Sequence, residues 1–266
     1  MLEHYLTSMV ITGKSEKSIA TRRLQLMAFL KWLEDTTGTN DVLEITKIDA
    51  VKYRNHLQEK GAKPNTVNTH LSSIESFCTW MVGEGLLTHN PVKGIKRVET
   101  APRAPRGLTK NERHRLMRVA ELDKNHRNGT LILTLLFAGL RVSELTELTP
   151  EDVVIGDRSG TITVRAGKGN KYRTVPIVGV LRKRLGEYIV NHRSAGKYLF
   201  PGQRDPKLSP RAVQLICKEY GEAAKIDNLT PHVLRHTLAH NLVEEGSPLG
   251  WVAAVLGHAS VTTTMV

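Results

Sequence analysis

The sequence predicts an α+β protein, mainly α-helical with a small β-sheet, in two domains. In residues 1–98, apolar side chains recur only at helical spacing. Residues 99–107 then hold two Ala-Pro-Arg repeats and a glycine, which cannot continue a helix. The remaining sequence mixes helical patterns with two β-branched segments. We therefore expect an N-terminal helical domain over 1–98, a basic linker over 99–107 and a second domain over 108–266.

The N-terminal domain should be a bundle of about four helices. The first long stripe comprises Ile19, Leu26, Met27, Leu30 and Leu33. The second comprises Val67, Leu71, Ile74, Cys78 and Met81. Between them, Thr46 and Asp49 form a variant of the capping box, and Gly61 ends the helix that they begin.

The second domain should begin with a helix capped by Thr109 and Glu112, followed by a buried helix at about 129–140. The segment TITVRAGKGNKYRTVPIV predicts a β-hairpin around a glycine-rich turn. A basic helix at 180–192 and three further helices follow. Two of these begin with Ser-Pro or Thr-Pro, at Pro210 and Pro231.

The charge of the chain indicates a polyanionic partner. Of the 266 residues, 38 are Lys or Arg and 26 are Asp or Glu, which gives a net charge of +12. The longest apolar run, 131–140, is too short to span a bilayer, and the N-terminus has no signal-peptide pattern. Cys78 and Cys217 lie in apolar helical segments, as buried thiols of a reducing compartment do. We expect a cytoplasmic protein that does not bind a membrane.

Two short patterns each place a basic residue in an unusual setting. In GLRVSEL, Arg141 ends an apolar helix, where it either binds an anion or forms a structural pair with Glu144. In RAGKGNKYR, Lys168 lies on the hairpin turn. Gly169 follows it where a P-loop requires Ser or Thr, so the turn is either a mobile phosphate contact or simply solvated.

Two further patterns contain histidine. In TPHVLRHT, His232 and Arg235 are three residues apart on one helix. Zinc binding by His232, His236 and His240 is disfavoured, because no carboxylate or cysteine completes the set and an arginine lies beside it. His258 in LGH follows an apolar helix, where a lone histidine is usually a packing residue.

Together and in this order, GLRVSEL, GKGNK with RTVPI, TPHVLRHT and LGHASVTTT resemble the motifs of the tyrosine recombinases, the phage integrase family. The resemblance covers about 108–266 strongly. Residues 1–98, including LLTHNPVKGIK, resemble the family's helical core DNA-binding domain more loosely. The resemblance implies a core-binding domain followed by a tyrosine-recombinase catalytic domain, of the short Xer-like or transposon-encoded type.

The resemblance also implies the chemistry. Arg141 and Arg235 would clamp the scissile phosphate, with Glu144 positioning Arg141. The other roles would be a hydrogen bond to the phosphate from His258, orientation or deprotonation of the nucleophile by His232, and protonation of the leaving 5′-oxygen by Lys168. No metal or other cofactor is needed.

The nucleophilic tyrosine of the family lies nine residues beyond the histidine of LGH, which is position 267 here. The sequence given runs to Val266. We expect residues 1–266 alone to be inactive in cleavage, whether the sequence is incomplete, truncated or derived from a recombinase that lost the tyrosine.

DNA contacts are expected on three segments. Arg211, Gln214 and Lys218 share the polar face of the helix at 209–225, which is either solvated or a reader of base edges. The other two sets are the helix start with Lys63, Asn65, Thr66 and Asn68, and the linker with Arg103 and Arg106.

The function that the resemblance implies is site-specific recombination of duplex DNA through a 3′-phosphotyrosyl intermediate, by a tetramer assembled on paired sites near the nucleoid. Two alternatives stay open. One is a DNA-binding regulator derived from a recombinase without the nucleophile. The other is a type IB topoisomerase-like enzyme, which shares the chemistry.

Overall fold

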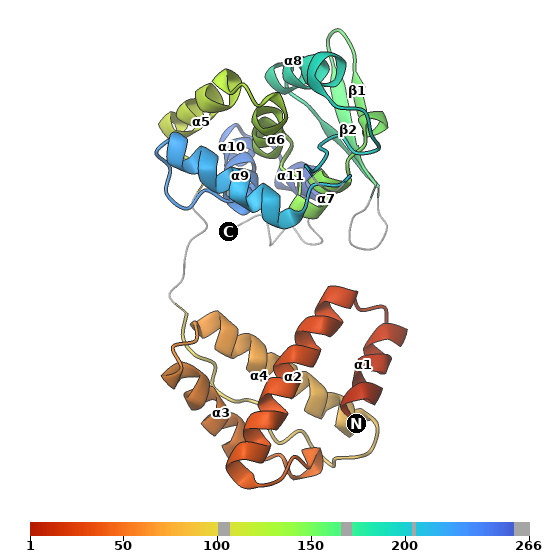
Figure 1. Cartoon of the computed structure of the whole chain (residues 1–266), viewed down its shortest axis with the longest axis vertical. Coiled ribbons are helices and arrows are strands. Elements are labelled where there is room, and N and C mark those ends of the chain that lie inside the picture. Colours follow the sequence, from red (N-terminus) through yellow and green to blue (C-terminus); the bar gives the residue numbers. More distant parts are fainter. Residues whose placement is uncertain (101–106, 166–171, 204–205, 258–266) are drawn as a thin grey trace. The chain divides into compact units, whose positions relative to one another are not determined.

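In the computed structural model the chain forms two compact units, Met1–Pro102 and Arg103–Val266 (Figure 1). The structure describes residues 1–100, 107–165, 172–203 and 206–257. Each unit has its own hydrophobic core. The predicted fold class is confirmed, since both units are mainly helical and the second carries a small sheet.

Within its described residues, 1–100, the N-terminal unit contains four α-helices. They are α1 (Leu2–Ile11), α2 (Glu16–Thr37), α3 (Lys47–Glu59) and α4 (Pro64–Gly83), with a 3-10 turn at Val42–Glu44. The predicted capping box begins α3, because the Thr46 hydroxyl accepts from the Asp49 N–H and the Asp49 carboxylate accepts from the Thr46 N–H. The helices α2 and α4 pack against each other, and α1 and α3 each pack on one or both of them.

The core of this unit confirms one predicted stripe and corrects the other. All five residues of the α4 stripe are buried. On α2, Leu26 and Leu33 are buried, but Met27 is 53% exposed and Phe29 is fully buried instead. The packed face of α2 runs through positions 26, 29 and 33, where Phe29 packs edge-on against Tyr53 of α3.

The second unit is a set of helices around α6 (His126–Ala138), which is buried along most of its length. The helices α5 (Lys110–Leu122), α8 (Gly179–Glu187) and α10 (Pro231–Glu244) contact α6. The other helices are α7 (Val142–Glu147), α9 (Pro210–Ala223) and α11 (Leu249–Leu256), with a 3-10 turn at Pro150–Asp152. The helix predicted at 180–192 is α8 followed by a π-helical turn, Tyr188–His192.

In the part of the second unit that the structure describes, three antiparallel strands form the sheet in the order β1 (Val153–Ile155), β2 (Gly160–Val164) and β3 (Arg173–Pro176). The predicted hairpin is confirmed as β2 and β3, in a register that pairs Ile162 with Val175. The three-residue strand β1 was not predicted. Strand β3 packs against α11, which brings its first residue to the end of that helix.

The expected helix caps are present. Ser209 and Thr230 accept hydrogen bonds at the starts of α9 and α10, each followed by proline at the first helical position. Cys78 and Cys217 are free, fully buried thiols. Among the described residues no helix is both long and apolar enough to cross a membrane.

Candidate functional site

The ion pair expected between Arg141 and Glu144 is present where α6 turns into α7. The chain leaves α6 at Gly139 with φ +59°, and Arg141 becomes the N-cap of α7. The Arg141 Nη1 donates to Glu144 Oε1 at 2.8 Å, and the Arg141 backbone N–H donates to Glu144 Oε2 at 2.8 Å. The Arg141 side chain is 37% exposed and that of Glu144 is 1% exposed, so the carboxylate anchors a guanidinium that reaches the surface.

A second arginine, Arg173 at the start of β3, holds the same carboxylate. Its Nη1 and Nη2 donate to the two oxygens of Glu144 at 2.8 and 2.7 Å, a two-point pair. Burial alone would raise the pKa of Glu144. The hydrogen bonds from Arg173 and from the Arg141 backbone outweigh burial and lower that pKa to about 2. The carboxylate is therefore ionised at any physiological pH.

Arg235 of α10 is the most buried of these arginines, at 7% exposure. Its Nη1 donates to the Gly139 carbonyl at 2.7 Å, and its Nη2 donates to the Leu256 carbonyl at 2.5 Å. Burial, together with the positive charge of Arg141, lowers the pKa of Arg235 to about 10, so the guanidinium stays charged at neutral pH. The negative charge of Glu144 acts in the opposite direction and raises the pKa of Arg235.

The three arginines meet at the C-terminal end of α11. Arg173 Nε donates to the Val255 carbonyl at 2.9 Å, Arg235 to that of Leu256 and Arg141 Nη2 to that of Gly257 at 2.5 Å. Three consecutive carbonyls at the end of this helix thus each receive a guanidinium, as suits the negative end of a helix. We call Arg141, Arg173, Arg235 and Glu144 the arginine cluster. His258, the next residue of the chain, lies outside the described residues.

Among the described residues, no hydrogen bond or ion pair joins the histidines of α10 to the arginine cluster. His232 is exposed, although it lies three residues from the buried Arg235. His236 is half-buried, and burial followed by the charge of neighbouring histidines and Arg235 lowers its pKa. His240 faces Glu244 of the same helix at 3.2 Å.

The three DNA-reading residues predicted on α9 are exposed and line one groove. Arg211, Gln214 and Lys218 form one wall of a groove of about 680 Å³, and the turn 225–230 forms the other. The opposite face of α9 is buried as expected, through Val213, Ile216, Cys217 and Tyr220. The polar face of this helix is therefore exposed, with Lys218 in a surface ion pair with Glu222 of the same helix at 3.6 Å.

At the start of α4, Lys63, Asn65 and Thr66 are exposed, as a DNA contact requires. Asn68 is half-buried, and its side-chain amide exchanges two hydrogen bonds of 2.9 Å with the backbone of Val98. Asn68 therefore has a structural role that does not require DNA, because its hydrogen bonds hold the segment around Val98 against α4.

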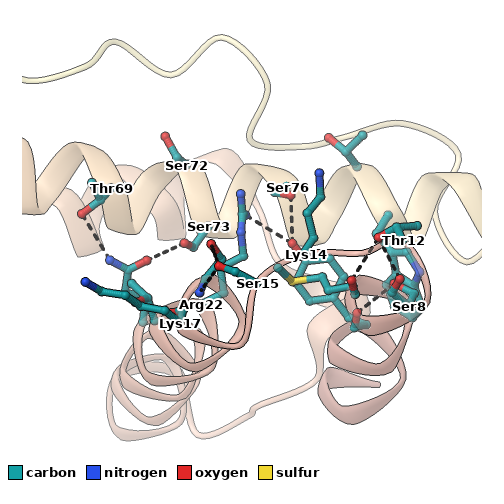
Figure 2. A pocket seen from close by; sticks show the side chains of 17 residues that line it. Ser8, Thr12, Lys14, Ser15, Lys17, Arg22, Thr69, Ser72, Ser73 and Ser76 are labelled. Carbon is teal, nitrogen blue, oxygen red and sulfur yellow. Dashed lines mark hydrogen bonds between the residues drawn. The ribbon is translucent and has the colours of Figure 1, made fainter. Parts of the chain in front are cut away.

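The N-terminal unit has a polar groove that the sequence did not predict (Figure 2). It has a volume of about 790 Å³ and lies between α1, α2 and α4. Lys14, Lys17 and Arg22 line it, and no acidic side chain does so among the described residues. Its other lining residues are largely hydroxyl-bearing: Ser8, Thr12, Ser15, Ser18, Thr21, Thr69, Ser72, Ser73, Ser76 and Thr79.

The basic groups of this groove differ in how they are held. Arg22 donates to the Tyr5 hydroxyl at 3.2 Å, and that hydroxyl is 2.8 Å from Ser76 Oγ. Lys14 and Lys17 are exposed and form no ion pair within the part of the chain that the structure describes. We call this feature the hydroxyl groove. The residues that line this groove come from three helices, so no short sequence motif predicts it.

Four predicted site residues lie outside the described residues: Lys168, His258, Arg103 and Arg106. One residue of the cluster was missed. Arg173 stands in the RTVPI segment, where a strand starting with arginine looks like an ordinary exposed strand end.

Comparison with protein families gives two matches. Residues 106–266 match the phage integrase family, and residues 2–85 match the phage integrase N-terminal SAM-like domain. The first match alone covers more than half of the chain.

Individual proteins agree with these matches. The tyrosine recombinase XerA of Pyrococcus furiosus is 33% identical over the whole chain and 88% of its own length. The tyrosine recombinase XerC of Neisseria meningitidis serogroup B is 30% identical over the whole chain and 89% of its own length.

Solved structures share the fold. A crystal structure of XerA recombinase is 26% identical, with a TM-score of 0.55 over 99% of this chain and 91% of that one. The XerH recombinase bound to palindromic difH is 21% identical, with a TM-score of 0.78 over 93% of this chain and 74% of that one. The chain therefore belongs to the phage integrase family, the tyrosine recombinases.

Proposed function

We propose that this tyrosine recombinase is a site-specific enzyme that cleaves and rejoins duplex DNA through a covalent 3′-phosphotyrosyl intermediate. The observation that carries the proposal is the convergence of Arg141 and Arg235 on the neighbouring carbonyls of Gly257 and Leu256. Arg141 is held in addition by Glu144, and Arg235 by the Gly139 carbonyl.

Two fixed guanidiniums suit a phosphodiester. Its transition state gathers negative charge on the non-bridging oxygens, and preorganised donors aimed at that charge lower the barrier. Each guanidinium has five N–H donors. Contacts with described residues engage two of these in each of Arg141 and Arg235, and the other three on each would serve the phosphate. The low exposure of Arg235 keeps water away from one side of the clamp.

The remaining roles follow from the family resemblance. A tyrosine at position 267 attacks the phosphorus, His232 orients or deprotonates its hydroxyl, and Lys168 protonates the leaving 5′-oxygen. His258 adds a hydrogen bond to the phosphate. Because the phosphotyrosyl link conserves the energy of the broken bond, rejoining needs neither ATP nor a metal.

DNA would meet exposed polar surfaces on both units. On the second unit these are Arg211, Gln214 and Lys218 of α9, where arginine and glutamine match base edges of the major groove. On the N-terminal unit, Lys63, Asn65 and Thr66 are exposed at the start of α4. The hydroxyl groove adds Lys14 and Lys17, which form no ion pair with a described residue, and many hydroxyl donors, which suit contacts with the phosphate backbone. Arg103 and Arg106 would add phosphate contacts from the linker.

Recombination joins two sites, so the working form would be a tetramer on paired duplexes. The buried free thiols and the polyanionic substrate fit the cytoplasm and association with the nucleoid. A DNA-binding regulator without the nucleophile and a type IB topoisomerase-like enzyme are the alternatives, and both would use the same DNA-binding surfaces.

The test uses the chain continued through a tyrosine at position 267 and a duplex selected by this protein from random sequences. We expect a covalent protein–DNA adduct in EDTA, trapped at a nick, and strand exchange between two such duplexes. Relaxation of supercoils without strand exchange would favour the topoisomerase-like alternative. Sequence-selective binding without any adduct would favour the regulator.

A further inference from the structure

We propose that Arg173 is a positioning residue of the phosphate clamp, which fixes Arg141 through Glu144 and fixes the end of α11 directly. The inference rests on the proposed function and goes beyond the set of residues assigned to it above. Arg173 itself does not touch the phosphate in this proposal.

The first support is the geometry of the Arg173–Glu144 pair. The two planar groups meet through two hydrogen bonds, of 2.8 and 2.7 Å, and the side chains are 12% and 1% exposed. Such a two-point contact sets the direction of the carboxylate as well as its position. Glu144 in turn receives Arg141 Nη1 on the same oxygen, Oε1, that receives Arg173 Nη1. The direction of the Arg141 guanidinium therefore depends on Arg173.

The second support is the contact of Arg173 with α11. Its Nε donates to the Val255 carbonyl at 2.9 Å. Its guanidinium also lies against Gly257, where a Cβ atom would come 2.8 Å from Nη1 and 3.0 Å from Cζ. Gly257 has φ +66°, so the turn that leads to His258 needs glycine for its backbone and for the space that Arg173 occupies.

The third support is the place of Arg173 in the chain. It is the first residue of β3, and it follows Lys168 by five positions. One side chain thus connects strand β3 to the carboxylate that pairs with Arg141 and to the C-terminal end of α11. Residues from three separate motifs are linked through a single guanidinium.

This linkage explains why the cluster contains three arginines and one carboxylate. Like charges so close together repel one another, and Glu144 alone compensates for them within the cluster. A third arginine that contributed only its positive charge would therefore destabilise the cluster. Arg173 uses all three of its nitrogens on named partners, as a structural fork does.

The test compares Arg173→Ala with Arg184→Ala in the chain continued through position 267. Arg184 of α8 is a matched control, because it belongs to the same unit, its side chain is also 12% exposed, and it pairs with Glu187 away from the cluster. Single-turnover cleavage at saturating DNA should be about 100-fold slower in Arg173→Ala, the loss typical of a misplaced reacting group, with unchanged DNA affinity. Arg184→Ala should cleave at the parental rate.

Chemical rescue separates positioning from general loss of structure. Guanidinium ion at millimolar concentration should restore much of the rate of Arg173→Ala, whereas urea, its neutral counterpart of the same shape, should not. If Arg173→Ala does not fold, Arg173→Lys keeps the charge but cannot form the two-point pair, and should fold yet cleave slowly. In a Glu144→Gln background, Arg173→Ala should cost less rate than it does in the parental protein, because only its contact with the end of α11 is then left to lose.

The outcomes distinguish this inference from the proposed function. Absence of any adduct in the parental protein would remove the proposed function and this role with it. Parental adduct formation with equal rates in Arg173→Ala and Arg184→Ala would overturn the positioning role alone. Equal rescue by urea and guanidinium, or a full additional loss in the Glu144→Gln background, would also overturn it.

Discussion

Arg235 donates a hydrogen bond of 2.5 Å to the carbonyl of Leu256, so that a buried cation of α10 closes the end of α11. The same guanidinium holds the Gly139 carbonyl at the end of α6. Helix ends that lack partners for their last carbonyls are stabilised by such a charge. Arg235, which we propose binds the phosphate, thus also connects α10 with the ends of α6 and α11. Its replacement should therefore affect both the stability of the protein and the cleavage of DNA.

Arg235→Lys tests this double role. Lysine keeps the charge but cannot reach both carbonyls in the planar geometry of arginine. We expect the free energy of unfolding to fall by about 3 kcal/mol, because a charged hydrogen bond is lost and a buried acceptor loses its partner. Adduct formation should slow by about 10²–10³-fold. Urea unfolding and single-turnover cleavage measure the two effects. Arg118→Lys, at an exposed position of α5, should change neither.

Gly257→Ala should be more harmful than Gly246→Ala. Both glycines have positive φ, +66° and +83°. Alanine at either position should cost about 1–2 kcal/mol for its left-handed backbone. At Gly246 a Cβ meets nothing within 4 Å, whereas at Gly257 it would press on Arg173 at 2.8 Å. We expect Gly257→Ala to lose about 1–3 kcal/mol more, by thermal or urea unfolding, and to cleave slowly. Equal losses of stability in the two variants would mean that the Arg173 side chain moves away from the added Cβ atom at no cost in free energy.

The pKa of Glu144 predicts how stability depends on pH. It is lowered from its ordinary 4.5 to about 2 in the folded protein, so its contribution is fully present above about pH 4.5 and is lost as the pH falls toward 2. The shift corresponds to about 3 kcal/mol. In urea unfolding, the stability difference between the parental protein and Glu144→Gln should therefore shrink between pH 6 and pH 3.

A control variant on the same helix checks the cause. Glu147 is 47% exposed and pairs with Lys207 on the surface, so Glu147→Gln should show little dependence on pH. A difference between the parental protein and Glu144→Gln that stays constant over this range would contradict the depressed pKa.

The sequence predicted those features that local chemistry decides. The capping box of Thr109 and Glu112 and the buried stripe of α9 depend on residues within a few positions of one another. The ion pair of Arg141 and Glu144 is of this kind too, because three positions at a helix start bring the two side chains together. The structure has all of these where the spacing indicates them.

The missed features depend on contacts between distant segments. Arg173 is 29 positions from Glu144 and 82 from Val255, and nothing in RTVPI indicates that its side chain is only 12% exposed. Strand β1 is three residues long at the sheet edge, with two of them exposed, so it carries almost no alternation. On α2, the choice between Met27 and Phe29 for the core is made by the partner helix, since Tyr53 of α3 offers an aromatic contact.

Lys17→Ala should weaken DNA binding and lower its dependence on salt. If the hydroxyl groove contacts the phosphate backbone, one lost contact reduces the slope of log affinity against log salt concentration by about 1. Lys52 is exposed on α3 of the same unit and does not line the groove. Lys52→Ala should leave the slope unchanged. Titration of a labelled duplex at several salt concentrations measures both, and equal slopes for the two variants would exclude the groove from the binding surface.

The last prediction separates the acid from the clamp, with Lys168→Ala and Arg235→Ala made in the chain continued through position 267. A substrate whose bridging 5′-oxygen is replaced by sulfur leaves as a thiolate, which needs no proton because it is a far better leaving group than an alkoxide. It should restore cleavage by the Lys168 variant. It should not restore cleavage by the Arg235 variant, because the charge on the non-bridging oxygens still has to be stabilised. Equal rescue of both variants, or of neither, would remove Lys168 from the acid role and leave it as a phosphate contact.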